Sequence, residues 1–373
     1  MEQYDCVVVG AGPAGATFAR QAAIRGLKVL ILEKEILPRY KACGGGLTPA
    51  VKKLLDFDYS SMIQRKVEGV AFLSGDDGEI IYYPDSMPVD MVARSEFDHF
   101  LVKQAVSAGA TLLEGASVVS VQESVDKVTI QTNTGEYFSA LVTVGADGAR
   151  SIVARSAGLD RKYWGIALEC ELFPHDPAVL DEFGKYSLFG FGFIPGADGY
   201  GWVFPKKDHF SVGIGGAAPT MPGLVSIYRD FVKRFTFLAN TREHMRRGWF
   251  LPYCKKTETV NTRRICLVGD SAHLVDPFSG EGIYPAILSG IIAADVVSGD
   301  LGQKGYLTRR YTREIKKQIA GDFMYGRWCS AIFYRAPSYF YKKNRVIQAL
   351  TRLSRKDIRY KDVLNELRKS RRA

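Results

Sequence analysis

The hydrophobic positions at the start of the chain change from one period to another, and this change predicts a β-α-β unit. Tyr4 to Gly10 form a continuous apolar run of the kind found in a buried strand. Pro13 to Arg25 follow with helical periodicity, and Lys28 to Glu33 form a second apolar run of β type. Such runs on either side of a helical pattern are typical of α/β folds. The chain therefore opens with a compact βαβ unit.

Turn and capping residues divide the next part of the chain into further elements. Thr48 before Pro49 is the pair expected at a helix N-terminus. Ser95, with Asp98 three residues on, resembles a capping box. We expect a helix from Thr48 to Leu55, followed by a hairpin over Val67 to Tyr83 that turns at Asp76, Asp77 and Gly78. A helix from Ser95 to Ser107 and strands between Thr111 and Val144 come next.

A different pattern occupies the middle of the chain. Tyr163 to Gly216 are rich in aromatic residues, β-branched residues and glycine and have no long helical period, which predicts an antiparallel sheet. Arg264 to Val268 return to the first β pattern and precede a helix from about Gly282 to Ser298. The remainder is helical, basic and aromatic. Segments of the opening type lie on both sides of the sheet region, so we expect two interleaved domains.

The composition is that of a globular protein, with 46% hydrophobic and 24% charged residues among 373. Met1 to Gly10 lack the basic region and cleavage site of a signal peptide. The apolar stretch from Gly282 to Val297 is interrupted by Pro285 and Asp295 and falls short of the roughly 20 residues of a spanning helix. The six cysteines contain no CxxC pair, so we expect no metal site, no disulfide framework and a cytoplasmic setting.

The formal net charge of +10 is concentrated at the C-terminal end of the chain. Residues 304–373 contain 20 Lys and Arg against 5 Asp and Glu, whereas the residues before them contain 30 against 35. The aromatic residues of this tail are Phe333, Tyr334, Tyr339, Phe340 and Tyr341, among the basic residues Arg335, Lys342, Lys343 and Arg345. Such a mixture suits an anionic membrane surface, and we expect peripheral contact at the inner face of the membrane. A solvated helical face would show the same charge. We expect no nucleic acid partner, because no recognised binding module accompanies the basic residues.

The turn between the first strand and the first helix has the GxGxxG spacing of a dinucleotide site. Gly10, Gly12 and Gly15 would let the backbone approach a pyrophosphate, whose charge lies at the helix N-terminus. Glu33 ends the second strand, 18 residues after Gly15, where a carboxylate can accept hydrogen bonds from an adenosine ribose. The strand, helix and acid together predict nucleotide binding, whereas the glycines alone could form a simple tight turn.

Two later segments suggest that the nucleotide is a flavin. Asp147 and Gly148 follow the apolar run from Leu141 to Val144 and precede a helix that starts near Ser151. Asp270 comes at another strand end, where it can bind a ribityl hydroxyl, and a glycine-rich segment then leads into a helix. The positive end of that helix can face the pyrimidine edge of a flavin and favour negative charge there. Each segment alone could also be an ordinary turn or loop.

With these three segments in order, the chain resembles the para-hydroxybenzoate-hydroxylase-like flavoproteins. The arginine of that group at the start of the helix after the first hairpin corresponds to Arg94. Residues 38–46, PRYKACGGG, resemble the cysteine-glycine segment of geranylgeranyl reductases. Residues 200–205, YGWVFP, with the trailing Gly213-Ile214-Gly215, are similar to the YxWxFP motif of the same family. The resemblance covers roughly residues 1–300.

The motifs and the resemblance imply a set of site residues. The residues expected to bind FAD are Gly10, Gly12, Ala14, Gly15, Glu33, Lys34, Cys43, Gly44, Gly45, Arg94, Val118, Asp147, Gly148, Asp270, Gly280, Gly282 and Ile283. The residues expected to line the substrate slot are Gly46, Tyr200, Trp202, Phe204 and Pro205. Strand alternation places the three aromatic residues of the second set on one face, although an aromatic strand can also be plain core.

The resemblance also implies the fold class and the division of the chain. We expect an α/β protein in which a Rossmann-like FAD-binding domain of the glutathione-reductase type is interleaved with an antiparallel-sheet substrate domain. The expected ranges are 1–65, 93–160 and 256–300 for the FAD-binding domain, 66–92 and 161–255 for the substrate domain, and 301–373 for a basic helical C-terminal region.

The activity that the resemblance implies is saturation of the isolated double bonds of a polyprenyl chain. Reduced FAD would deliver a hydride from N5 to one alkene carbon while a proton reaches the other, so the site needs an acid. Cys43 is the candidate donor, with Tyr200 or a bound water as alternatives, although a cysteine there could also be a small packing residue. The sequence shows no second complete GxGxxG domain. NAD(P)H and a reduced ferredoxin-like partner both remain open as electron donors.

Other functions on the same scaffold are also open. Flavin monooxygenases and halogenases share the fold, and halogenases carry a WxWxIP segment that the YxWxFP run partly resembles. A reductase acting on a menaquinone side chain is a closer neighbour that the sequence does not separate. A non-catalytic flavin-binding or membrane-associated protein is an alternative from a different class. Head group, chain length, the number of bonds reduced and oligomeric state do not follow from the sequence.

Overall fold

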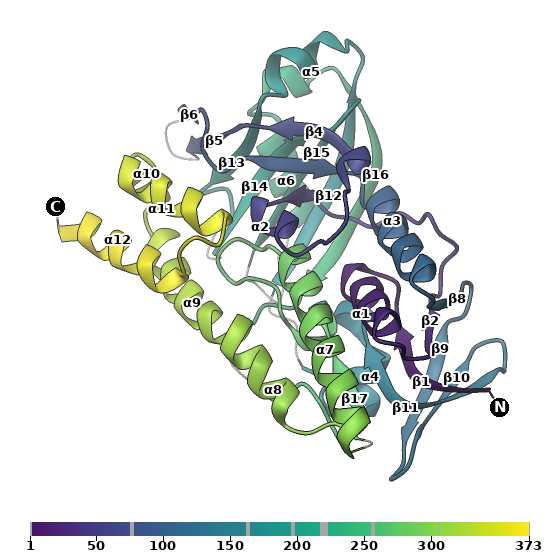
Figure 1. Cartoon of the computed structure of the whole chain (residues 1–373). Helices are drawn as coiled ribbons and strands as arrows, with labels where there is room; N and C mark the ends of the chain where they lie inside the picture. The colour runs from purple at the N-terminus through teal and green to yellow at the C-terminus, as the bar shows by residue number, and fades with distance from the viewer. Residues whose placement is uncertain are drawn as a thin grey trace.

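The opening strand, β1 (Glu2–Val9), lies inside a seven-stranded sheet (Figure 1). The computed structural model describes residues 2–74, 78–161, 165–194, 198–216, 223–254, 258–304 and 306–372. β1 pairs in parallel with β2 (Val29–Leu32) and with β11 (Tyr137–Gly145). The strands order as β8, β2, β1, β11, β10 and β9, with bounds Thr111–Leu113 for β8, Val118–Glu123 for β9 and Val128–Thr132 for β10. The second half of β11 also pairs in parallel with β17 (Ile265–Leu267). A strand from late in the chain thus completes the sheet that the N-terminus begins.

α1 (Pro13–Ile24) packs on the first sheet and is flanked by two further helices. It contacts both α3 (Arg94–Ser107) and α7 (Ile283–Lys304). The approach of α1 and α7 depends on Gly290, where an added Cβ would lie 2.6 Å from the carbonyl oxygen of Ala14. This close contact fixes the start of α1 against the eighth residue of α7.

α7 is longer than the sequence pattern indicated. Pro285 does not interrupt it, because proline is tolerated in the first turn, where backbone N–H groups have no helical partner. Its window from Ile283 to Leu301 is long and apolar enough to cross a membrane, so the expectation that the stretch is too short was wrong. The window is 67% buried within the protein, as in the core helix of a globular domain.

The second sheet also has seven strands, in the order β16, β12, β15, β14, β13, β5 and β6. Their bounds are Thr241–Leu251, Gly165–Pro174, Phe210–Gly216, Gly199–Pro205, Tyr186–Phe191, Gly69–Ser74 and Ile80–Tyr83. The sheet is antiparallel except where β13 runs parallel to β5, so it is mixed rather than purely antiparallel. The short helices α5 (Ala178–Phe183) and α6 (Leu224–Val232) lie in the same part of the chain. β5 and β6 form the expected hairpin, and its turn at Asp76 and Asp77 lies outside the described residues.

A small third sheet connects the other two. It contains β3 (Gly46–Leu47), β7 (Val89–Val92) and β4 (Ile63–Val67), with β7 in the middle. β3 directly follows the segment that carries Cys43, and β7 leads into α3 through Arg94. The third sheet therefore holds these two predicted site residues close together.

Two predicted helices differ in detail from the expectation: α2 (Pro49–Lys52) starts after Thr48 as predicted but ends before Leu55, and α3 starts one residue earlier than predicted. The Thr48 hydroxyl donates to the carboxylate of Glu281, at 2.8 Å, instead of capping the helix. α3 begins at Arg94 with Ala93 at the N-cap position, so Ser95 and Asp98 form no capping box. The Asp98 carboxylate instead accepts two hydrogen bonds from Arg94, at 2.7 and 2.9 Å. In neither case does a side chain cap the helix.

The C-terminal region is folded against the body of the protein (Figure 1). It comprises α8 (Arg310–Ile315), a π-helical turn η5 (Lys316–Ala320), α9 (Gly321–Phe333), α10 (Pro337–Tyr341), α11 (Asn344–Ser354) and α12 (Tyr360–Arg372). Phe333, Phe340 and Tyr341 are buried, and Tyr341 stacks on Phe72 of β5 with ring centroids 5.1 Å apart. Of the five aromatic residues expected to meet a membrane, only Tyr339 is exposed. That expectation was therefore wrong for Phe333, Phe340 and Tyr341, because their rings pack into the core, and Tyr334 is half-buried.

Candidate active site

The three glycines of the first turn occupy three different environments. Gly10 has φ +102°, and a Cβ there would lie 2.5 Å from the Ala146 carbonyl oxygen. A Cβ at Gly15 would overlap the Gly10 carbonyl oxygen, so this glycine allows the helix to pack on the strand. A Cβ at Gly12 would meet only the Arg39 guanidinium, at 3.9 Å. A tight turn, a close helix and an open backbone position between them are the three roles that a dinucleotide-binding turn requires. The residues present therefore fit FAD at this turn.

Glu33 lies at the edge of this turn, as the sequence predicted. Its carboxylate is buried and accepts a hydrogen bond from the Ala11 N–H at 2.8 Å. Each carboxylate oxygen can accept more than one hydrogen bond, so acceptor capacity remains for a ribose. The carbonyl of Glu33 accepts from the Ala116 N–H at 2.9 Å, which brings the start of β9 and Val118 to the same edge. Lys34 instead has an exposed side chain beside Glu35, at 3.7 Å.

Arg39 is a candidate site residue that the sequence reasoning missed. Its guanidinium donates to Asp98 at 3.1 Å, lies 4.0 Å from Glu33 and is the nearest group to the open face of Gly12. A cation in this place suits the pyrophosphate that the glycine turn is expected to receive. Arg39 lies within the cysteine-glycine motif, but its spacing gave no sign that it reaches the glycine turn.

The segment with Asp147 lies directly beside the first glycine turn. The Ala146 N–H donates to the Val9 carbonyl at 2.8 Å, at the end of β1. The Asp147 side chain is occupied by α4 (Ile152–Ser156): it accepts from the Ser151 hydroxyl at 2.5 Å and from the Ile152 N–H at 2.7 Å. Burial raises the pKa of Asp147, and these hydrogen bonds oppose the rise. The carboxylate thus holds its own loop in place, and Gly148 is the position with open space above it.

The third predicted segment brings Asp270 to the N-terminus of α7. A Cβ at Gly282 would lie 3.7 Å from the Asp270 carboxylate, and Ile283 begins the helix. Burial raises the pKa of Asp270, while Lys41 and Arg94 lower it, so both cations lie within electrostatic range. Unpaired N–H groups at a helix start favour negative charge. This end of the site can therefore hold an anionic edge of a ligand.

The loop before α7 is held by a residue from the last helix of the chain. Asp276 is buried and accepts from the Phe278 N–H at 2.8 Å and the Ser279 N–H at 3.2 Å. Its other oxygen accepts from the hydroxyl of Tyr360, at 2.6 Å. Tyr360 is itself buried, and burial raises the pKa of its phenol well above the usual range, so the hydroxyl stays a donor.

Three further hydroxyls bind carbonyl groups of the same loop. The donors and acceptors are Ser330 to Pro277 at 2.9 Å, Tyr334 to Phe278 at 2.9 Å and Tyr200 to Ser279 at 2.6 Å. Ser330 and Tyr334 belong to the C-terminal region and Tyr200 to the second sheet. The loop at the start of α7 is thus fixed by parts of the chain far from it in sequence. The sequence gave no signal for these contacts.

The cysteine-glycine segment packs onto the aromatic face of β14. A Cβ at Gly44 would lie 2.7 Å from the Phe204 ring and 3.3 Å from the Trp202 indole nitrogen. The ring of Trp202 lies 6.2 Å from that of Tyr200 and 6.4 Å from that of Phe204, measured between centroids. The structure therefore brings the two motifs of the reductase resemblance together. Gly46 begins β3, and a Cβ there would lie 3.8 Å from the ring of Phe204, the residue before Pro205 at the end of β14.

Cys43 lies among three cations. Its sulfur accepts from the Gly45 N–H at 3.4 Å. Burial lowers the pKa of Arg94, but Asp98 and Cys43 more than offset this and raise it. Burial also lowers the pKa of Lys41 and of Lys206, each to about 8, and Cys43 acts against the shift in both cases. Three basic side chains therefore lie within electrostatic range of the Cys43 thiol.

Lys206 and Glu169 are two buried ionisable residues that the sequence reasoning missed. Lys206 follows the YxWxFP motif, and its ammonium donates to the carbonyls of Gly44 and Val92. Glu169 of β12 accepts from Tyr40 at 2.6 Å and from Ser211 at 2.9 Å, and burial raises its pKa to about 7. Both residues therefore attach the segment that carries Cys43 to the second sheet.

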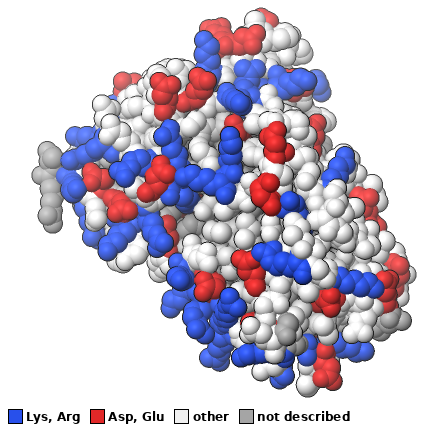
Figure 2. All heavy atoms as spheres, viewed as in Figure 1, with Lys and Arg blue, Asp and Glu red and all other residues white. Residues whose placement is uncertain are grey.

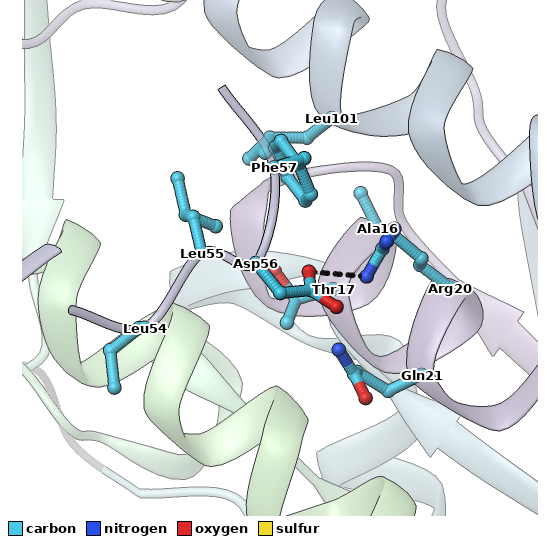
Figure 3. A pocket seen from close by; sticks show the side chains of 9 residues that line it. All are labelled: Ala16, Thr17, Arg20, Gln21, Leu54, Leu55, Asp56, Phe57 and Leu101. Carbon is cyan, nitrogen blue, oxygen red and sulfur yellow. Dashed lines mark hydrogen bonds and ion pairs between the residues drawn. The ribbon is translucent and has the colours of Figure 1, made fainter. Parts of the chain in front are cut away.

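The pocket drawn in Figure 3 lies apart from these residues. It is a crevice between α1, residues 54–57 and α3, bridged by an ion pair of 2.6 Å between Arg20 and Asp56. Its lining is Ala16, Thr17, Arg20, Gln21, Leu54, Leu55, Asp56, Phe57 and Leu101. The empty space is about 240 Å³, part of it open to solvent, and it contains none of the predicted site residues. Cofactor sites usually need about 300 Å³ or more, so we assign no ligand to it.

Comparison with known proteins agrees with this geometry. A family model described as an FAD binding domain matches residues 3–173. The chain is 32% identical to a digeranylgeranylglycerophospholipid reductase of Methanothrix thermoacetophila over 85% of each chain. It is 31% identical to a menaquinone reductase of Mycobacterium tuberculosis, over 84% of this chain and 81% of that one.

Solved structures show the same fold. A geranylgeranyl bacteriochlorophyll reductase-like protein of Thermoplasma acidophilum superposes with a TM-score of 0.78 at 25% identity, over 98% of this chain and 96% of that one. A flavin-dependent brominase has a TM-score of 0.74 at 19% identity, over 95% of this chain and 93% of that one, a likeness of fold alone. The predicted fold class, a mixed α/β protein with an FAD-binding fold, is confirmed.

Proposed function

Because the chain belongs to the geranylgeranyl reductase family of FAD-dependent oxidoreductases, we propose that it saturates isolated carbon-carbon double bonds in the polyprenyl chain of an isoprenoid lipid or a prenyl diphosphate. One observation carries the proposal. The Cys43 segment, the aromatic face of β14 and the loop before α7 meet at one place, with Gly44 against Trp202 and Phe204 and Tyr200 bonded to Ser279.

The residues around this meeting point suit an apolar chain. Tyr200, Trp202 and Phe204 offer a row of rings, and Phe189 lies 5.3 Å from both Tyr200 and Phe204. The polar groups nearby already have partners: the Trp202 indole donates to Ser211 at 3.4 Å, and the Tyr200 hydroxyl donates to a carbonyl. A surface of aromatic rings with satisfied polar groups favours an alkene over a polar substrate.

The chain's own residues then have separate tasks in the reaction. When bound, FAD supplies the hydride for one alkene carbon. Cys43 holds the proton for the other carbon, and Arg94 and Lys206 stabilise the sulfur once the proton has left. Tyr200 is the weaker candidate for the proton donor, because its hydroxyl already donates a hydrogen bond to the Ser279 carbonyl and burial raises the pKa of its phenol. Electrons reach the cofactor from NAD(P)H or from a ferredoxin-like protein.

Replacing Cys43 by alanine is expected to slow alkene reduction by about 10²- to 10⁴-fold, the usual contribution of a general acid. FAD binding should persist, because the glycine turn, Glu33 and the α7 N-terminus are untouched. Single-turnover reduction under anaerobic conditions, followed by mass spectrometry, measures the rate, and the flavin absorbance measures occupancy. Unchanged turnover in the C43A protein would remove Cys43 from the mechanism.

The experiment that tests the proposed function is anaerobic incubation of the FAD-loaded protein with dithionite and a panel of prenyl lipids. The expected result is a gain of one hydrogen pair in mass for each bond reduced. A parallel reaction in air with the same substrates distinguishes a monooxygenase or halogenase, which would consume oxygen and add oxygen or halogen to the product. Failure to reduce any prenyl chain, with the flavin reduced and bound, would refute the proposal.

A menaquinone side chain is the second candidate substrate. It is favoured by the 31% identity to a protein named menaquinone reductase. The reactive group is again an isolated alkene in a polyprenyl chain, so the same site residues would serve. Including a menaquinone in the lipid panel distinguishes this candidate from an isoprenoid lipid or prenyl diphosphate. At low substrate concentration, only the preferred substrate should gain hydrogen.

A further inference from the structure

The outward face of α9 exposes large aromatic side chains in an otherwise well-packed region. Trp328 is 60% exposed and Tyr325, three residues before it, is 40% exposed. Met324 and Ile332 are half-buried and lie four residues on either side of Trp328, so they share its face of the helix. The four side chains, Met324, Tyr325, Trp328 and Ile332, form one apolar strip, which we call the α9 strip.

Basic residues lie at both ends of the α9 strip. Arg310 and Arg313 of α8 and Lys316 and Lys317 of η5 are exposed before it, and Arg335 is exposed after it. The two acidic residues between positions 310 and 335 are engaged with neighbours, Glu314 with Gln318 at 2.9 Å and Asp322 with the Tyr360 N–H at 3.0 Å. Figure 2 shows Lys and Arg gathered over the C-terminal helices. The face therefore presents positive charge around an aromatic centre.

The inward face of the same helix contacts the candidate active site. Ser330 and Tyr334 bind the carbonyls of Pro277 and Phe278 in the loop before α7. A helix with its side chains is roughly 10 Å across. The α9 strip is thus about one helix diameter from the loop at which the flavin ring is expected.

We propose that the α9 strip and its flanking basic residues form a docking surface for an anionic lipid bilayer. Tryptophan and tyrosine prefer the interface between headgroups and acyl chains, and lysine and arginine bind the anionic headgroups. Aliphatic Met324 and Ile332 beside the rings suit acyl chains better than a nucleic acid backbone. Docking through the α9 strip places the active site beside the bilayer, where an isoprenoid lipid resides. The benefit of such docking for catalysis rests on the proposed function.

The proposal is tested with the full-length, FAD-loaded protein and two kinds of vesicle, pure phosphatidylcholine and phosphatidylcholine with phosphatidylglycerol. We expect co-sedimentation with the anionic vesicles, weakened by salt. The W328S/Y325S variant should lose at least tenfold in partitioning, an order-of-magnitude expectation for removing two interfacial aromatics. In the K316Q/K317Q variant, partitioning to the anionic vesicles should fall roughly 30-fold, because two contacts with lipid headgroups are removed. Brominated lipid should quench the tryptophan fluorescence of the unaltered protein, and this quenching should disappear in the W328F variant.

Matched controls lie on other faces of the protein. Tyr137 is 49% exposed on β11, and Lys127 and Lys185 are exposed far from α9 in sequence. Y137S and K127Q/K185Q should bind vesicles like the unaltered protein. Flavin content and reduction of a short, water-soluble prenyl substrate should be the same in all variants. Unchanged vesicle binding by both α9 variants, or binding to RNA in preference to vesicles, would overturn the proposal. Vesicle binding without any alkene reduction would instead refute only the proposed function.

Discussion

The hydroxyl of Tyr360 is the contact through which the last helix acts on the active site. It donates to the buried carboxylate of Asp276, which in turn orders the Phe278 and Ser279 N–H groups. A hydrogen bond to a charged group contributes about 1.5–3 kcal/mol, and its loss leaves a buried acceptor without its donor. Tyr360 is therefore a positioning residue for the loop before α7.

We expect Tyr360→Phe to weaken FAD binding by about tenfold or more and to shift the flavin reduction potential, because the loop before α7 loses its hydrogen bond from the last helix. Titration of the apoprotein with FAD and a spectroelectrochemical measurement provide the two readouts. Tyr137→Phe, at an exposed site, is the control. Lower thermal stability with an unaltered potential would show that Tyr360 is merely structural.

Glu169 makes a pH-dependent contribution to stability. Its pKa rises from 4.5 to about 7 on folding because the carboxyl is buried. The folded protein therefore binds this proton more tightly than the unfolded chain does. The stabilisation is fully present below pH 4.5 and is lost as pH rises through 7.

Relative to the Glu169→Gln variant, the unaltered protein should become less stable between pH 4.5 and 7.5, by up to ~3 kcal/mol. Urea unfolding of both proteins at several pH values measures the difference. The difference in free energy of unfolding between the two proteins removes the contribution that the other carboxylates make to both. A difference that does not vary with pH would mean that Glu169 stays ionised in the fold.

At the scale of elements, the contact between α1 and α7 holds together two helices that begin at the expected cofactor site. Both helices begin at the site, and Gly290 allows them to approach. We expect Gly290→Ala to destabilise the protein by about 1–3 kcal/mol, because the added Cβ meets the Ala14 backbone, which cannot move alone.

Gly299→Ala, on the same helix, is the matched control. Its Cβ would meet only the flexible end of Arg310 at 3.4 Å, so higher helix propensity should leave stability unchanged or raise it by up to about 1 kcal/mol. Thermal unfolding of both variants measures the effect. Equal destabilisation of the two would indicate that helix propensity, not the contact with α1, is decisive.

The C-terminal helices also decide which variants are informative. Removal of residues 342–373 would take away α11 and α12, and with them the Tyr360 contact to Asp276. Such a truncation would disturb the active site and also remove the basic residues of α11 and α12, while leaving the α9 strip and its flanking basic residues in the chain. Substitutions on the outward face of α9 separate the two effects, because they leave every hydrogen bond to the loop in place.

At the scale of the whole molecule, the segment around Cys43 joins the two large sheets. Gly44 touches the aromatic face of β14, and Lys206 and Tyr40 attach the same segment to the second sheet. The proposed substrate region and the expected cofactor region therefore meet at a segment with no room for a side chain at position 44.

Gly44→Ala should displace Phe204 and Trp202 and lower the rate of prenyl reduction by roughly tenfold or more, since small displacements of reacting groups are costly. FAD binding through the first glycine turn should change little. Steady-state kinetics, with kcat and KM determined separately, together with the flavin spectrum, provide the test. Normal kinetics with a prenyl substrate would show that this aromatic face does not position the chain.

The sequence by itself determined the parts of this protein that depend on local chemistry. The tight turn at Gly10 and Gly15, the position of Glu33 and the alternation of Tyr200, Trp202 and Phe204 follow from backbone geometry and residue spacing, and the structure shows these local arrangements. The order of the flavin segments and the reductase motifs also predicted the fold class and the family.

Only the tertiary structure decided which distant residues meet. Arg39 beside Gly12, Lys206 at Gly44 and Tyr360 on Asp276 are contacts between elements that no local pattern specifies, because they depend on how the sheets and helices pack. The same packing turned the C-terminal aromatics inward and left Trp328 and Tyr325 outside. Residue type predicts that an aromatic side chain seeks an apolar environment, but the fold determines whether that environment is the core or a surface.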